Sequence, residues 1–188
     1  MKDKRVLLIT QTAVFIALLV SAQAFTRPFG QFVTGSSVNF ILVASCVLAG
    51  IYSAAAVAVV SPVFAYLIVG VPLFPQIIPF IMAGNLALVI AIYFISGRKS
   101  FGKLNLVSYL RIGAAVLVGA ALKFLVLWLG IVNFVLTIIP DIKPPQVDAM
   151  SAAFSWPQLI TALIGASLAM AVMPNLMKAL KQPDRAES

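Results

Sequence analysis

The chain has no histidine, a single cysteine (Cys46) and only five acidic residues among its 188. One cysteine cannot form a disulfide within the chain, and the lack of histidine excludes a Cys/His metal site and Ser–His or Cys–His catalysis. The acidic residues all fall in the tails or in one connecting segment: Asp3, Asp141, Asp148, Asp184 and Glu187. The apolar segments therefore hold no paired carboxylates for acid–base work. We expect no enzyme, no metal and no cofactor.

What the chain does contain is apolar sequence. Hydrophobic residues make up 62% of it and charged residues only 10%. This composition is typical of a polytopic membrane protein and not of a soluble domain. No hydrophilic stretch is long enough to fold separately, so residues 1–188 form one integral membrane domain. The net charge of +8 does not indicate nucleic acid, because membrane topology explains where the basic residues lie.

Six apolar segments predict an all-α bundle of six transmembrane helices. We place them at about 6–25, 38–52, 54–71, 77–96, 107–139 and 156–180. The second and third form a nearly continuous run, which as one helix would far exceed a membrane core of ~30 Å at ~1.5 Å per residue. We place the break at Gly50-Ile51-Tyr52-Ser53 and expect Ser61-Pro62 to kink the third helix.

The distribution of basic residues predicts the orientation. With the N-terminus inside, only Arg27 and Lys143 lie outside, and the cytoplasmic pieces carry Lys2, Lys4, Arg5, Arg98, Lys99, Lys103, Arg111, Lys178, Lys181 and Arg185. This asymmetry follows the positive-inside rule, so we expect both termini in the cytoplasm. A competing interpretation reads the N-terminal segment as a signal peptide that ends at Ala22-Gln23-Ala24. Cleavage there would leave five helices in the same orientation, but the apolar run is long for a signal peptide.

Lys123 is the most informative residue. It lies in the middle of an apolar run long enough to cross a bilayer, where a cation costs roughly 2.5–3.5 kcal/mol on insertion scales. Such a residue needs a partner, water or a bound ligand, and no acidic residue lies within an apolar segment to neutralise it. A ligand is therefore a serious candidate.

Other large polar side chains gather in the outer half of the predicted bundle. This pattern suits a solute pocket that opens outward, with a few polar groups among apolar walls. Besides Lys123, the candidate binding residues are Asn39, Gln76, Asn85, Trp128, Asn133 and Gln158. Each has a plainer alternative. Amides near helix ends are also typical of caps or the membrane interface, Asn85 could join helices by a hydrogen bond, and Trp128 could be an interfacial anchor.

Ala13 and Ala17 lie four residues apart on one face of the first helix. Small residues with this spacing let another helix approach closely. They form either a docking surface for a partner membrane subunit or ordinary packing within the bundle.

Taken together, these features resemble the substrate-binding S-component of energy-coupling factor (ECF) vitamin transporters. The resemblance covers nearly the whole chain, and Ala13-x-x-x-Ala17 looks like the signature with which S-components dock on a shared coupling subunit. Gly35-Ser36-Ser37-Val38-Asn39 and Pro79-Phe80-Ile81-Met82-Ala83-Gly84-Asn85 look like the broad S-component family that includes riboflavin, pantothenate and pyridoxine binders. In that family an Asn of the fourth helix and a Lys of the fifth contact the vitamin, which implies these roles for Asn85 and Lys123.

The resemblance implies a multi-pass protein of a prokaryotic plasma membrane. Its partners would be lipid, a small solute of the vitamin class, the coupling transmembrane subunit and two ATPase subunits. The chain has no Gly-x-x-x-x-Gly-Lys-[Ser/Thr] phosphate loop, so ATP hydrolysis must come from those partners. The acidic, proline-containing start of the second helix typical of riboflavin binders is missing, as is the aromatic- and Glu-rich pocket of thiamine binders.

Two other classes of function remain open at this point. The chain could be a membrane scaffold or assembly subunit without a solute. It could also be an intramembrane enzyme that uses Lys123 as a Schiff base, although the missing histidine and carboxylates disfavour this. The sequence does not name the solute: a lysine with amides suits a carboxylate, phosphate or carbonyl, as in pantothenate, pyridoxine-type or riboflavin-type molecules.

Overall fold

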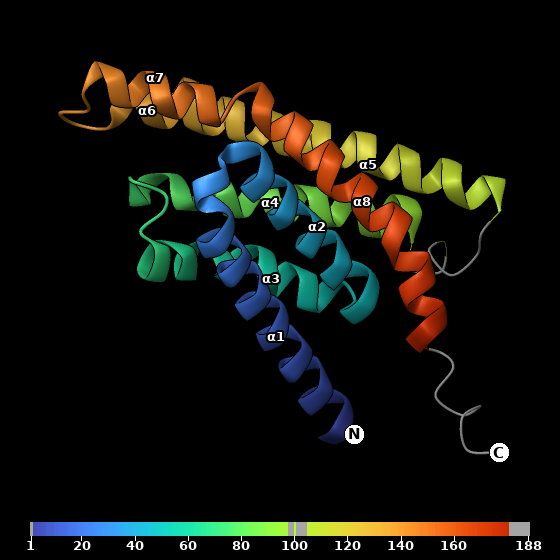
Figure 1. Ribbon diagram of the computed structural model, residues 1–188. Coiled ribbons are helices and arrows are strands. Elements are labelled where there is room, and N and C mark those ends of the chain that lie inside the picture. The colour runs from blue at the N-terminus through green and yellow to red at the C-terminus, as the bar shows by residue number, and fades with distance from the viewer. Residues whose placement is uncertain (1, 98–99, 101–104, 181–188) are drawn as a thin grey trace, which may run out of the picture.

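The computed structural model describes residues 2–97, 100 and 105–180 of the chain (Figure 1). Within these residues every regular element is a helix. Six helical stretches are long and apolar enough to cross a membrane: Arg5–Phe29, Gln31–Ala49, Ile51–Val69, Pro75–Ser96, Leu106–Ile138 and Pro144–Ala179. The predicted all-α, six-span architecture of a multi-pass membrane protein is therefore confirmed.

The first three spans are α1 (Lys2–Thr26), α2 (Gln31–Ala49) and α3 (Ile51–Phe64), and a short 3-10 turn, η1 (Arg27–Phe29), joins the first two. The break between α2 and α3 falls at Gly50, as predicted, with φ 92°. Glycine suits this turn because a Cβ disfavours positive φ. Pro62 lies inside α3, and the helix widens just after it into a π-helical segment, η2 (Ala65–Val69).

The last three spans are each built from several pieces. The fourth consists of η3 (Pro75–Ile77), α4 (Ile78–Ala91) and the π segment η4 (Ile92–Ser96). The fifth consists of α5 (Leu106–Leu127), the π segment η6 (Trp128–Val135) and α6 (Leu136–Ile138). A short helix, α7 (Pro144–Ala153), then precedes α8 (Trp156–Leu180).

Successive spans run in opposite directions, which sorts their connections between two ends of the bundle (Figure 1). We call the end with η1, the 70–77 segment and α7 the connection end. We call the opposite end the terminal end, and it holds Gly50, the start of α1 and the end of α8. The prediction of orientation used five basic residues that lie outside the described residues: Arg98, Lys99, Lys103, Lys181 and Arg185.

Two elements differ from the sequence-based expectation. α2 begins at Gln31, well before the predicted position near residue 38. Its small polar first turns stay helical because they pack on α8, where Thr161 lies beside Gly35. The unpredicted helix is α7, which is too short and polar to resemble a span. Its start is fixed by the Lys143 backbone N–H, which donates to Gln146 Oε1 at 3.1 Å.

Close approach of α2 and α8 shapes the middle of the bundle. A Cβ placed on Gly165 of α8 would lie 2.8 Å from Asn39 Cβ, and one placed on Gly35 of α2 would lie 2.9 Å from Thr161. Each helix thus contributes a glycine where the other comes nearest, as small residues do at tight membrane helix contacts. The result is that Asn39 and Thr161 face each other.

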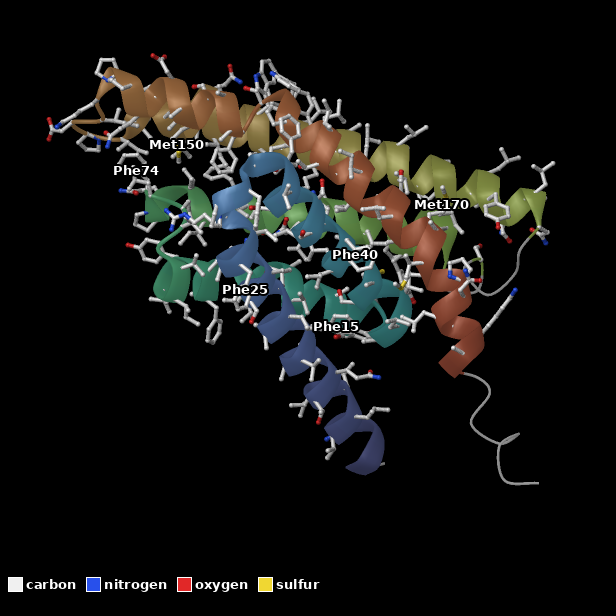
Figure 2. The ribbon with its side chains drawn as sticks, viewed as in Figure 1. Phe15, Phe25, Phe40, Phe74, Met150 and Met170 are labelled. Atoms are coloured by element: carbon white, nitrogen blue, oxygen red, sulfur yellow. The ribbon has the colours of Figure 1, made fainter. Side chains whose placement is uncertain are left out.

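Buried apolar side chains form two clusters. The larger fills the bundle between α1, α2, α3, α4, α5 and α8, and Phe15, Phe40 and Met170 pack against it (Figure 2). The smaller lies at the connection end, where Phe74 and Met150 pack against it (Figure 2). Val38 of the larger cluster and Leu127 of the smaller both line one cavity.

Candidate functional site

Lys123 lies deep in the bundle, near the C-terminal end of α5. Its side chain is only 3% exposed. The Nζ donates to Asn39 Oδ1 of α2 at 2.6 Å and to Asn85 Oδ1 of α4 at 2.8 Å. The structure thus brings together three residues that the sequence singled out separately, from three different spans.

Asn39 is fully buried and is held by a second contact. Its Nδ2 donates to Thr161 Oγ1 of α8 at 3.5 Å, a long and weak bond, and Thr161 Oγ1 donates in turn to Gln158 O at 3.2 Å. With its amide nitrogen turned toward α8, Asn39 presents its oxygen to the ammonium. α8 therefore helps to orient the group that holds Lys123.

When it is protonated, Lys123 meets only neutral groups among the described side chains in this arrangement. Both contacts are to neutral amide oxygens, and within the part of the chain that the structure describes no carboxylate lies within 4 Å of Nζ. An ammonium has three donors, and described groups accept from two of them. In the protonated form, one N–H and an uncompensated positive charge therefore remain for another group.

A cavity of about 150 Å³ adjoins this cluster. Residues from all six spans line it, among them Pro62 of α3 and Leu127 of α5. Its polar lining consists of Gln23, Gln31, Thr34, Asn39, Asn85, Lys123 and Gln158. Gln31 is exposed, and Val71 and Pro72 of the α3–α4 connection also contribute, so the cavity reaches the connection end.

Gln23 belongs to this lining although sequence reasoning did not select it. It lies three residues before the end of α1, and its Oε1 is buried without a hydrogen-bond partner among the described residues. Leaving a buried acceptor unpaired costs roughly 1–3 kcal/mol. The available signal was a lone amide in an apolar helix, although Ala22-Gln23-Ala24 also has the pattern of a signal-peptide cleavage site.

Gln158 also lines the cavity and is 6% exposed, and its Nε2 donates to Ala153 O at 3.0 Å. Three predicted site residues lie elsewhere. Gln76 is exposed and does not line the cavity. Asn133 is exposed and donates to Trp128 O at 2.9 Å, which satisfies a carbonyl in the π segment η6. Trp128 stacks on Phe124, with ring centroids 6.2 Å apart, and is 37% exposed.

The predicted docking residues Ala13 and Ala17 are exposed on α1. Figure 1 shows the N-terminal half of α1 extending away from the other helices. Both alanines are therefore exposed and are not packed inside the described bundle.

Within the described residues, no three His, Cys, Asp or Glu side chains gather into a group that would hold a metal ion. What the cavity offers instead is a buried cation with a free donor, amide groups and apolar walls. Such a lining can hold a small molecule by hydrogen bonds and shape. No protein-family model, curated protein or solved structure matches the chain.

Proposed function

We propose that the chain is the substrate-binding subunit of an ATP-driven importer of the ECF type in a prokaryotic plasma membrane. It captures a small solute of the vitamin class from outside through the connection end. Both termini lie in the cytoplasm. A coupling transmembrane subunit and two ATPase subunits supply the energy, and the chain itself performs no chemistry on the solute.

The observation that carries the proposal is the ammonium of Lys123. It is buried within the membrane-spanning part, bonded to two neutral amides, faced by no described carboxylate, and placed on the wall of a cavity. A protein that needed only a stable bundle would gain by an apolar residue at this position, because a cation costs roughly 2.5–3.5 kcal/mol there. A bound solute with an acceptor oxygen offsets that cost.

The two asparagines position the charge without cancelling it. Hydrogen bonds to a charged group contribute roughly 1.5–3 kcal/mol each, so Asn39 and Asn85 keep the ammonium stable in the empty site. Because they carry no charge, the attraction for an anionic or carbonyl oxygen is retained. A carboxylate in their place would compete with the solute.

The exposed face of α1 supports association with a membrane partner. Ala13 and Ala17 leave room for close contact with another helix. The same face would also suit a scaffold subunit without a solute, which is the alternative function. The two differ in what occupies the cavity.

Mass spectrometry of small molecules extracted from the purified chain tests the proposal. We expect a defined solute to copurify with the wild type. Lys123→Met should bind it about 10- to 150-fold more weakly, the equivalent of one lost charge-assisted hydrogen bond. Asn85→Ala should also weaken binding, because the ammonium loses one of its two anchors.

Asn133→Ala is the matched control, since Asn133 is also a membrane-span amide but lies outside the cavity. It should retain the solute at the wild-type level. If only lipid or detergent is recovered from every variant, and other proteins copurify instead, the chain is a scaffold and the importer proposal fails. A carbonyl ligand trapped on Lys123 by borohydride would indicate an enzyme.

A further inference from the structure

Two polar groups of opposite hydrogen-bonding character line the cavity. Lys123 is buried in α5 and, as an ammonium, has one N–H left to donate after its bonds to Asn39 and Asn85. Gln23 lies near the connection end, and its buried Oε1 has no donor among the described residues. Both residues line the same space. A solute that satisfies both must therefore carry an acceptor and, at another position, a donor.

Gln23 differs from three other amides of the cavity lining because its side-chain oxygen is buried and has no hydrogen-bond donor among the described residues. Asn39 and Asn85 accept from Lys123, and Gln158 donates to Ala153 O. The three buried side-chain atoms without a partner among the described residues are Gln23 Oε1 and the hydroxyls of Ser36 and Ser61. Only Gln23 among them lines this cavity. A buried acceptor without a hydrogen-bond donor among the described residues, Gln23 Oε1, therefore belongs to a residue that lines the solute cavity.

The volume of the cavity limits how much of a solute can be enclosed. At about 150 Å³ the space matches one known to enclose a single benzene ring, and it is well below the roughly 300–1,000 Å³ of pockets for larger ligands. A fused three-ring system would extend out of it toward the connection end. The enclosed group is therefore one ring or a chain of similar size.

We propose that the cavity selects a compact solute, of one ring or its equivalent, that presents a carboxylate or carbonyl oxygen to Lys123 and an N–H or O–H donor to Gln23. The inference rests on the proposed function and specifies its substrate class. Lys123 fixes the acceptor end of the solute. Gln23 distinguishes solutes that also carry a donor from those that do not.

Benzoate and the three aminobenzoates are suitable probes. They share a ring and a carboxylate, and the ring position of the amine varies its distance from the carboxylate. With the purified full chain in detergent, calorimetry should show at least one aminobenzoate binding about tenfold more tightly than benzoate. Gln23→Met should abolish this preference while benzoate affinity stays the same. Lys123→Met should weaken benzoate and aminobenzoates alike.

Gln76→Met is the matched control, because Gln76 is exposed and outside the cavity. It should leave the preference intact. If benzoate and all aminobenzoates bind equally well, or if the preference survives Gln23→Met, the role of Gln23 is wrong. The importer proposal then still stands, provided that a copurified solute depends on Lys123. If no solute copurifies and no probe binding depends on Lys123, both proposals fail.

Discussion

Buried polar residues in this chain divide into those with a partner and those without. Ser45 and Ser61 make the contrast clear, since both are fully buried in neighbouring helices, α2 and α3. The Ser45 hydroxyl donates to Leu42 O at 2.7 Å, whereas the Ser61 hydroxyl has no partner among the described residues. Ser61 also does not line the solute cavity. Its hydroxyl is therefore a cost to stability with no ligand to offset it.

We expect Ser61→Ala to stabilise the protein. Removing a buried unpaired hydroxyl should gain about 1 kcal/mol, because the desolvation penalty disappears and the methyl group fits the same space. Thermal unfolding in detergent, followed by fluorescence, measures the shift in Tm. Ser45→Ala is the control, and it should be neutral or destabilising because it loses a hydrogen bond. Equal shifts for the two variants would contradict this account.

The site could be anticipated from sequence only where a residue conflicted with its surroundings. Lys123 was conspicuous because a cation in an apolar run is costly in any fold. Gln76 and Gln158 were equivalent by that criterion, because both are amides near the start of a span. The structure separates them: Gln158 of α8 is buried on the cavity wall, and Gln76 of the 3-10 turn η3 is exposed. Which side chains are buried depends on packing among all six spans, which no local pattern specifies.

At the scale of elements, the number of spans followed directly from hydropathy, and their ends did not. The break at Gly50 was predictable because a continuous apolar run of that length exceeds the membrane. The early start of α2 was not, because Thr34-Gly35-Ser36-Ser37 has the composition of a turn. Contact with α8 makes it helical and places Asn39 well inside α2 instead of near its start.

The α2–α8 contact should tolerate no side chain at Gly165. We expect Gly165→Ala to lower stability by roughly 1–3 kcal/mol, because the new Cβ would lie 2.8 Å from Asn39 Cβ and force the helices apart. Solute binding should weaken as well, since Asn39 holds Lys123. Tm and solute affinity, measured on the same preparation, test both effects.

Gly113→Ala provides the control for backbone effects. Gly113 lies in α5, and a Cβ there would meet nothing within 4 Å. Replacing an unconstrained helical glycine by alanine should be neutral or stabilise by up to about 1 kcal/mol. If both variants behave alike, helix propensity and not the α2–α8 contact determines the result.

At the scale of the whole molecule, the orientation of the protein in the membrane decides to which side the cavity opens. The cavity reaches the connection end, which carries Arg27 and Lys143, whereas Arg5, Arg111 and Lys178 belong to the terminal end. Under the positive-inside rule the terminal end is cytoplasmic. A solute would then enter from outside, as import requires. The opposite orientation would open the same cavity to the cytoplasm.

Labelling of single cysteines tests this orientation. Phe29 at the connection end is 72% exposed and Leu106 at the terminal end is 74% exposed, so the two positions are matched in accessibility. The native Cys46 is 2% exposed and should react little. We expect a membrane-impermeant maleimide to label Phe29→Cys in intact cells and Leu106→Cys only after lysis. The reverse pattern would turn the cavity mouth toward the cytoplasm, and a protein oriented in that way could not capture an external solute even if Lys123 binds one.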